Sequence, residues 1–256
     1  RSTYFPALDG ARGVAVLVGM IPHFSIMRPV TAVETAYMQS AGLGGAGGDL
    51  FFVLSGFLIT GILMDARTGS GFFRNFYARR ALRIFPLYYA FLFVILLVWP
   101  LLTQAPAEPL APKLWTLGYM GNFIFALEGW DGVPGHTTHL WSLAVEEQFY
   151  LIWPFVVFFA SRKGLIRICL GAILVAWFFR LGSHFWMGNG IGGYALLPAR
   201  MDALALGGLL AVTVRKEGWA DALRPMLPRI LLAGLTLLLA AAVWSRALDP
   251  GGELFP

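Results

Sequence analysis

Long apolar runs constrain this chain more than any other feature of its sequence. Several of them approach or exceed the roughly 18–20 residues that an α-helix needs to cross the hydrocarbon core of a bilayer. They occupy residues 11–29, 48–64, 82–102, 140–160, 164–180, 192–214 and 229–247. Only 13% of the 256 residues are charged, against roughly 25% in a soluble domain. The sequence therefore predicts an all-α fold, a polytopic bundle of transmembrane helices with seven to eight spans.

A shorter apolar segment, residues 114–127, suits a re-entrant or interfacial helix better than a full crossing. The basic residues support this interpretation. If the N-terminus is cytoplasmic and this segment does not cross, the loops 65–81, 161–167 and 215–228 face the cytoplasm. These loops are rich in Lys and Arg, whereas the loops on the opposite side contain a single basic residue, Lys113. Because cytoplasmic loops carry the excess of Lys and Arg, we expect seven crossings, one partial segment and a cytoplasmic N-terminus.

The net charge of +5 does not indicate a nucleic-acid partner, because the excess of basic residues in a membrane protein belongs to its cytoplasmic loops. The single cysteine, Cys169, excludes an internal disulfide framework and a cysteine-based metal cluster. We expect it to pack as a small residue in its apolar run. His136 and His139 have a spacing that suits a metal, but no third ligand is evident. The sequence therefore predicts no metal, no nucleic acid and a lipid bilayer as the environment.

Ionisable side chains inside the apolar runs are the strongest functional signal, because each costs several kcal/mol in a bilayer unless it is paired or hydrated. Asp9 and Arg12 lie about one turn apart, and His23 lies about three turns beyond Arg12 on the same helix face. Glu146 and Glu147 lie in another run. An imidazole and two carboxylates in an apolar bundle suit proton-transfer chemistry, although helical spacing does not show that they meet.

Structural interpretations of the same charges stay open. The glutamates could neutralise Arg180, which ends one run, or Arg200, which lies near Asp202 in the next. A lone intramembrane histidine can be a packing residue that is hydrogen-bonded to a neighbouring helix. A proton-coupled transporter would use these groups as a proton path, but the internal repeat of many transporters is not visible. A non-catalytic scaffold would not need charges this costly.

Two other stretches need an explanation. The glycine-rich stretch at residues 42–52 has no following Gly-Lys-Ser/Thr and is not a phosphate-binding loop. It favours a flexible hinge that opens a helix at Asp49. In FYARRALRIFPLYY, Arg79, Arg80 and Arg83 directly precede an apolar run. These arginines either anchor the cytoplasmic end of a helix or bind an anionic ligand there.

Five blocks in a fixed order resemble the membrane-bound acyltransferase-3 family. They are DGARGVAVLVGMIPHFS, GGDLFFVLSGFLI, FYARRALRIFPLYY, LWSLAVEEQFYLIWP and LLPARMDALALGG. The resemblance implies an acyl-CoA-dependent O-acyltransferase of the bacterial inner membrane. Its acyl group is expected to be acetyl, and its acceptor a hydroxyl of a cell-envelope glycan, a lipid-linked sugar or a macrolide. Because the family often has about ten helices, we expect residues 1–256 to be one integral-membrane acyltransferase domain that is truncated at its C-terminal end.

The resemblance also implies catalytic residues. The essential histidine of the family corresponds to His23, which would act as the general base. Its N-terminal arginine corresponds to Arg12, which would stabilise the developing oxyanion, with Asp9 in the same block. Glu146 or Glu147 would orient the imidazole of His23.

Donor-binding and supporting residues follow from the remaining blocks. Arg79, Arg80 and Arg83 would hold the phosphates of acetyl-CoA, or of another acyl-CoA, at the cytoplasmic helix mouth. Ser55 belongs to an aromatic-serine-glycine motif and is either an acyl relay or a helix-packing residue beside Gly56. The other residues expected to support the site are Ser142, Arg180, Arg200 and Asp202.

Overall fold

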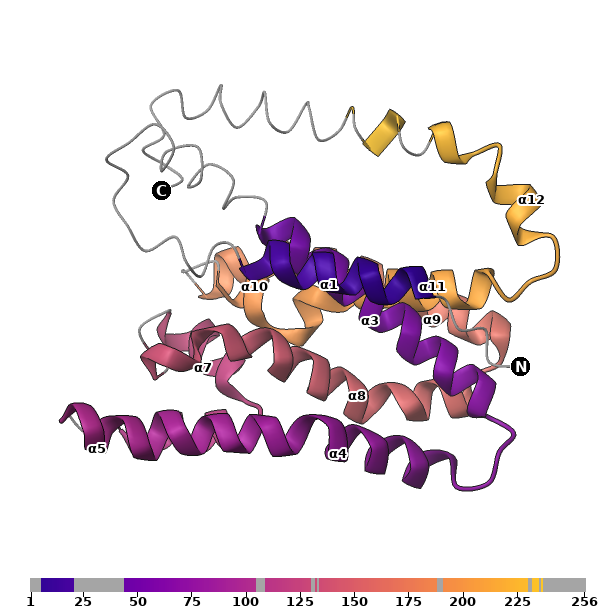
Figure 1. Cartoon of the computed structure of the whole chain (residues 1–256). Helices are drawn as coiled ribbons and strands as arrows, with labels where there is room; N and C mark the ends of the chain where they lie inside the picture. The colour runs from indigo at the N-terminus through magenta and orange to yellow at the C-terminus, as the bar shows by residue number, and fades with distance from the viewer. Residues whose placement is uncertain are drawn as a thin grey trace. The chain divides into compact units, whose positions relative to one another are not determined.

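The computed structural model describes residues 6–20, 44–104, 109–129, 132, 134–187, 191–229, 232–234 and 236. Every regular element in these ranges is helical (Figure 1), as the sequence predicts. The chain divides into two compact units, Arg1–Val212 and Thr213–Pro256. The second unit contains the short helix α12, Trp219–Leu223.

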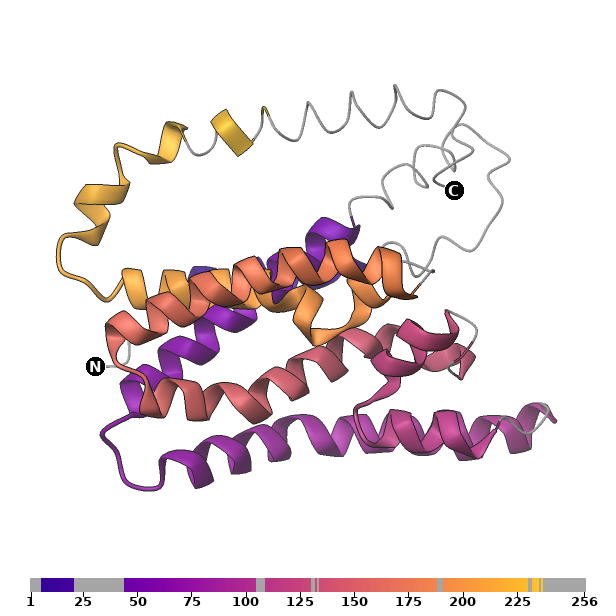
Figure 2. The same cartoon turned by 180° about the vertical axis from the view of Figure 1, so that it is seen from behind.

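The first unit holds the long helices and the short elements between them. Its elements are α1 (Pro6–Met20), α3 (Gly44–Ala66), α4 (Phe72–Phe93), η2 (Val94–Val98), α5 (Trp99–Thr103), α6 (Leu110–Leu117), α7 (Gly121–Glu128), η4 (Gly135–Leu140), α8 (Trp141–Phe159), α9 (Arg162–Met187), α10 (Gly192–Ala195) and α11 (Leu197–Thr213). In Figures 1 and 2, α4 runs alongside α8. The hydroxyl of Tyr77 on α4 donates to the carbonyl oxygen of Leu151 on α8 at 2.8 Å.

Five helical segments of the described residues are long and apolar enough to cross a bilayer. They are Gly45–Ala66, Phe72–Thr103, His136–Phe159, Arg162–Ser183 and Gly192–Thr213. Each overlaps one predicted run, which confirms that these five runs form helices long and apolar enough to cross a bilayer. The predicted span 11–29 is described only as far as residue 20, and the predicted span 229–247 lies largely outside the described residues. The total of seven to eight spans is therefore not confirmed.

The helix that contains the predicted apolar run 82–102 begins before that run. Helix α4 begins at Phe72 and continues through η2 and α5 to Thr103. Its arginines lower the local hydropathy, but Phe72 and Phe76 are buried and fix the first turns against the bundle. Gly71 precedes the helix with a φ of 71°, a conformation that glycine adopts at little cost. Arg80 therefore lies roughly 12 Å along the helix axis from its first residue, and Arg83 roughly 16 Å.

The short segment 114–127 is divided between two helices of 8 residues each, α6 and α7. Tyr119 lies in the turn between them, with a φ of 57°. Helices of this length are too short to cross a bilayer. Buried Ile124 and Phe125 attach α7 to the main core, and a re-entrant or interfacial position for the segment stays a prediction.

Two of the predicted cytoplasmic loops lie at the same end of the first unit. Arg67, which follows α3, donates from Nη1 to the carbonyl oxygen of Ala160 at 2.8 Å. Arg162 donates from Nη2 to the carbonyl oxygen of Val212 at 3.0 Å. The α3–α4 loop, the α8–α9 loop and the end of α11 therefore meet at one end, called the basic end below. This is the arrangement that the charge bias requires, while the direction of the bundle in the membrane stays a prediction.

Glycines allow α3 and α11 to cross with their backbones in contact. A Cβ at Gly56 of α3 would overlap the carbonyl oxygen of Leu204, and a Cβ at Gly207 of α11 would overlap the carbonyl oxygen of Val53. Small residues at such crossings are typical of membrane helices. Beside the crossing, Cys169 is buried as a free thiol, which confirms its predicted packing role.

Candidate active site

Arg80 points from α4 into the bundle, where it meets α8. Its guanidinium lies 4.2 Å from the centroid of the Tyr150 ring, a distance at which the ring face attracts a cation. Tyr150 is 2% exposed, and its hydroxyl donates to Oε1 of Glu146 at 2.9 Å. Glu146 is itself 3% exposed. In the interior of the first unit, a cation therefore lies on the face of an aromatic ring whose hydroxyl donates to a carboxylate.

Glu147 lies beside this stack and is half-buried. The positive charge of Arg80 acts on its carboxylate, as does the negative charge of Glu146. Its Oε1 atom is buried and accepts no hydrogen bond. The sequence prediction left open whether the glutamates neutralise Arg180 or Arg200, but those two arginines have aspartate partners. The cation beside Glu147 is Arg80, which comes from a different block.

Tyr119 closes the site on the side of the α6–α7 turn. Its ring stacks on that of Tyr88 of α4, with centroids 4.0 Å apart. Its backbone carbonyl accepts a 2.9 Å hydrogen bond from Nε2 of Gln148, and the same Nε2 lies 2.9 Å from Oδ1 of Asn122. These bonds fix the turn directly against α8, one residue beyond Glu147. Burial, reinforced by the charge of Glu147, raises the pKa of Tyr119, so its hydroxyl keeps its proton and can donate it.

Ser55 reaches the same region from α3. It is 1% exposed and approaches the hydroxyl of Tyr150, but its Oγ makes no hydrogen bond of good geometry. The neighbouring Gly56 contacts the backbone of α11. Ser55 is thus held at a fixed depth in the bundle. Ser142, one of the residues expected to support the site, donates from Oγ to the carbonyl oxygen of His139 at 3.3 Å, at the start of α8.

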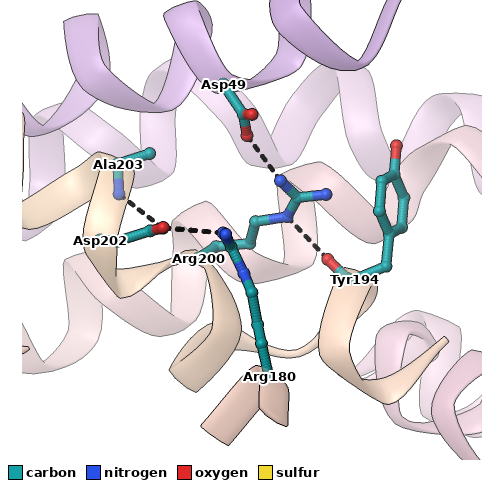
Figure 3. A network of polar contacts seen from close by, with 6 residues as sticks. All are labelled: Asp49, Arg180, Tyr194, Arg200, Asp202 and Ala203. Carbon is teal, nitrogen blue, oxygen red and sulfur yellow. Dashed lines mark hydrogen bonds and ion pairs between the residues drawn. The ribbon is translucent and has the colours of Figure 1, made fainter. Parts of the chain in front are cut away.

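A second polar network connects residues that the sequence singled out separately (Figure 3). Arg200 of α11 donates from Nη1 to Oδ1 of Asp49 at 2.5 Å, and from Nε to the carbonyl oxygen of Tyr194 at 2.7 Å. Arg180 of α9 lies 2.9 Å from Oδ2 of Asp202. The network joins α3, α9, α10 and α11. Asp49, which the sequence predicted only to open a helix, is therefore the counter-ion of a buried arginine.

Aromatic rings surround the Arg200 guanidinium. Its Cζ atom lies 4.2 Å from the ring centroid of Tyr194, 5.3 Å from that of Trp141 and 5.8 Å from that of Phe52. Three ring faces and one carboxylate compensate the burial of a cation that is 6% exposed. Sequence patterns gave no sign of this arrangement, because the rings come from three different helices.

Three of the predicted catalytic residues cannot be placed from the structure. His23 lies outside the described residues, and the side chains of Asp9 and Arg12 on α1 are not described either. The backbone of α1 packs on α3, where a Cβ at Gly47 would meet the backbone of Gly19 and Ala15. The roles of His23, Arg12 and Asp9 stay predictions.

Arg79 and Arg83 differ from Arg80 in their surroundings. Both are exposed, and Arg79 donates from Nε to the carbonyl oxygen of Asn75 in its own helix at 3.0 Å. Arg80 alone of the three has its guanidinium over the Tyr150 ring. The block that the sequence treats as one unit therefore has one inward arginine and two exposed ones.

The described part of the chain has no group of three or more His, Cys, Asp or Glu side chains placed to hold a metal ion. His136 and His139 contact aromatic rings instead, with centroids 5.4 Å from those of Trp99 and Phe91 respectively.

The fold and the site define a class of protein, a polytopic helical membrane protein in which an arginine and two carboxylates face one another between α4 and α8. The chain belongs to the acyltransferase-3 family, whose sequence model, described as an acyltransferase domain, matches residues 5–249. This confirms the predicted family and favours an enzyme over the transporter and scaffold interpretations.

Individual relatives are longer than this chain. YrhL of Bacillus subtilis is 39% identical over 184 residues, which cover 67% of this chain and 26% of that protein. The peptidoglycan O-acetyltransferase OatA of Listeria monocytogenes is 31% identical over 186 residues, 68% of this chain and 28% of its own. The O-acetyltransferase OatA of Staphylococcus aureus is 31% identical over 226 residues, which cover 81% of this chain and 34% of that protein. The chain thus spans about a quarter to a third of these relatives. No solved structure gives a significant match.

Proposed function

We propose that this protein is a membrane-embedded O-acetyltransferase that moves an acetyl group from acetyl-CoA to a hydroxyl of a cell-envelope glycan. The observation that carries the proposal is the family match over residues 5–249. The names of two relatives, a peptidoglycan O-acetyltransferase and an O-acetyltransferase, support acetyl as the group and a glycan as the acceptor. Five apolar helices support a multi-pass membrane protein, for which we propose the bacterial inner membrane and a cytoplasmic N-terminus.

In the proposed reaction the acceptor hydroxyl attacks the carbonyl carbon of the thioester. A C–O bond forms and the C–S bond breaks, so the products are an acetyl ester and free CoA. His23 would take the proton of the hydroxyl as general base and deliver it to the leaving sulfur. A glutamate would orient the imidazole and stabilise its charged form. Glu147 suits this role because its buried Oε1 has no hydrogen-bond partner, whereas Oε1 of Glu146 accepts a bond from Tyr150.

The remaining parts of the proposal concern charge. Arg12, in the same block as Asp9, would stabilise the negative charge that develops on the thioester oxygen. The exposed Arg79 and Arg83 of α4 would bind the CoA phosphates, because arginine pairs with phosphate through two parallel hydrogen bonds.

The test is a transfer assay with purified protein in detergent, acetyl-CoA and glycan fragments of peptidoglycan. We expect release of CoA together with acetyl esters on the glycan, detected by mass spectrometry. His23→Ala should abolish transfer while membrane insertion and thermal unfolding stay as in the wild type. Near-normal turnover by this variant would remove His23 from the mechanism, and a wild type that acetylates no glycan would refute the proposed acceptor.

A further inference from the structure

Two amide side chains, Asn122 of α7 and Gln148 of α8, form a reciprocal pair. Nε2 of Gln148 lies 2.9 Å from Oδ1 of Asn122, and Nδ2 of Asn122 lies 3.3 Å from Oε1 of Gln148. The same Nε2 donates to the carbonyl oxygen of Tyr119 at 2.9 Å, and the same Nδ2 donates to that of Ala195 at 3.3 Å. Asn122 is 0% exposed. Each amide nitrogen therefore has two acceptors for its two hydrogens.

The pair gives the bundle something that apolar packing would not. Taking an amide out of water costs free energy unless the amide is hydrogen-bonded. Replacing both partners of a buried hydrogen bond by apolar side chains of the same shape can be nearly neutral for stability. What two paired amides add is direction, because their hydrogen bonds form only within a narrow range of distances and angles. The pair therefore fixes how α7 and α8 face each other.

The α6–α7 turn is attached on its other side to α4. The hydroxyl of Tyr88 donates to the carbonyl oxygen of Thr116, and the hydroxyl of Tyr89 donates to that of Leu117 at 3.3 Å. Both carbonyls belong to the last turn of α6. In an apolar environment, backbone groups at a helix end need such partners. The turn is thus held between α4 and α8, beside the residue that follows Glu147.

The amide pair also connects α8 to the second polar network (Figure 3). Ala195 belongs to α10, and the residue before it, Tyr194, accepts from Nε of Arg200 at 2.7 Å. Arg200 in turn donates to Asp49 of α3. Just before Asp49, at Gly47, α3 lies against the backbone of α1. Hydrogen bonds therefore run from α8 through α7, α10 and α11 to the part of α3 that packs on α1.

Both ends of this series lie next to predicted catalytic residues. Glu147 directly precedes Gln148, and Arg12 belongs to α1. We propose that Asn122 and Gln148 are positioning residues for acetyl transfer, which hold Glu147 at a fixed rotation and depth relative to α1. Both amides act through the helices that they join, and neither touches the reacting groups. This inference rests on the proposed function, in which Glu147 orients the general base.

The test exchanges the two amides. Asn122→Gln lengthens one side chain by a methylene and Gln148→Asn shortens the other by a methylene, so each single variant breaks the fit of the pair. The double variant, with both changes, keeps two amides and restores their combined length. Gln104→Asn, at an exposed position, is the matched control. Initial rates at varied acetyl-CoA concentration give kcat and KM, and thermal unfolding checks each fold.

We expect each single variant to lower kcat by about tenfold or more, because displacing a catalytic group by about 1 Å can cost about a hundredfold in rate. The KM for acetyl-CoA should stay at its wild-type value, since neither amide belongs to the proposed donor site. The double variant should recover most of the lost kcat, and Gln104→Asn should keep the wild-type kcat.

The single variants are expected to fold, because a side-chain hydrogen bond between membrane helices contributes only about 0.6 kcal/mol on average. If one of them does not fold, Gln148→Met takes its place. Methionine keeps the length of the glutamine side chain and loses its hydrogen bonds, so this variant should also lower kcat at an unchanged KM.

Wild-type kcat in the single variants would overturn the inference, and so would a double variant as slow as the slower single variant. A lower unfolding temperature with an unchanged kcat would also overturn it, because the pair would then only stabilise the bundle. Failure of the proposed function has a different signature, since the wild type itself would then transfer no acetyl group.

Discussion

At the scale of residues, Arg200 and Arg180 show how differently two intramembrane arginines can be held. Arg200 is buried among three rings, with Asp49 as its counter-ion. The side chain of Arg180 is 36% exposed and pairs with Asp202. The side chain of Asp49 is 52% exposed, so the two arginines differ chiefly in the rings around Arg200, and such contacts contribute about 2 kcal/mol or more to a desolvated cation. The two positions therefore separate burial from charge.

We accordingly expect Arg200→Ala to lower the unfolding temperature of the purified protein much more than Arg180→Ala. Asp49→Asn keeps a hydrogen-bond acceptor for the guanidinium and should fall between the two. Thermal unfolding in a single detergent measures all three variants. Equal losses from Arg200→Ala and Arg180→Ala would mean that the rings around Arg200 contribute nothing to stability.

The glutamates allow a prediction about activity. Glu146→Gln and Glu147→Gln keep the shape of each side chain but remove its charge, so neither can stabilise a protonated imidazole. We expect at least one of them to lower the initial rate of acetyl transfer by more than about tenfold. Glu128→Gln, at an exposed position in α7, is the matched control and should keep the wild-type rate. Wild-type rates in both single variants and in the double variant would exclude the pair from the mechanism.

At the scale of elements, the crossing of α3 and α11 depends on two glycines whose missing Cβ atoms leave room for the facing backbone. Gly56→Ala and Gly207→Ala should each destabilise the protein by about 1–3 kcal/mol or more. The added Cβ would overlap main-chain atoms of the facing helix, which cannot move aside as the end of a flexible side chain can. Gly171→Ala in α9 is the control, since a Cβ there meets nothing within 4 Å and alanine favours the helix. Expression and thermal unfolding of the three variants measure the effect. A loss at Gly171 as large as at Gly56 would argue against a close crossing.

Sequence patterns predicted elements well where a single helix carries the signal. Hydropathy located five spans, and the length of segment 114–127 correctly indicated that no single helix crosses there. The same method did not locate the start of α4, because Arg79, Arg80 and Arg83 lower the hydropathy of turns that Phe72 and Phe76 nevertheless bury. Where a helix ends depends on what the flanking residues contact, and the average hydropathy of a sequence window does not contain that information.

At the scale of the molecule, contacts between distant blocks were beyond prediction. Asp49 and Arg200 are 151 positions apart, and Arg80 meets Tyr150 from a separate block. Spacing along one helix tells which side chains share a face, but not which helix that face will meet. The resemblance named the blocks that hold the candidate site, while the different surroundings of the three arginines of one block came only from the structure.

The arrangement of loops leads to a prediction about topology. The contacts of Arg67 with Ala160 and of Arg162 with Val212 put the α3–α4 and α8–α9 loops at the basic end. The continuous segment Phe72–Thr103 has 32 residues, a length of roughly 48 Å, so its last residue lies at the opposite end. The native Cys169 is buried and should give little background in thiol labelling.

We therefore expect single cysteines at Ser70 and Ser161, both exposed in these loops, to react with a membrane-impermeant maleimide only in inverted vesicles. A cysteine at Thr103 should react only in intact spheroplasts, because it lies across the bilayer from the basic loops. The charge bias towards the cytoplasm fixes the direction of this expectation. If all three cysteines react from the opposite sides, the arrangement of the helices is supported but the bundle has the inverse orientation in the membrane. Reaction of Ser70→Cys and Ser161→Cys from opposite sides is the result that the contacts at the basic end do not allow.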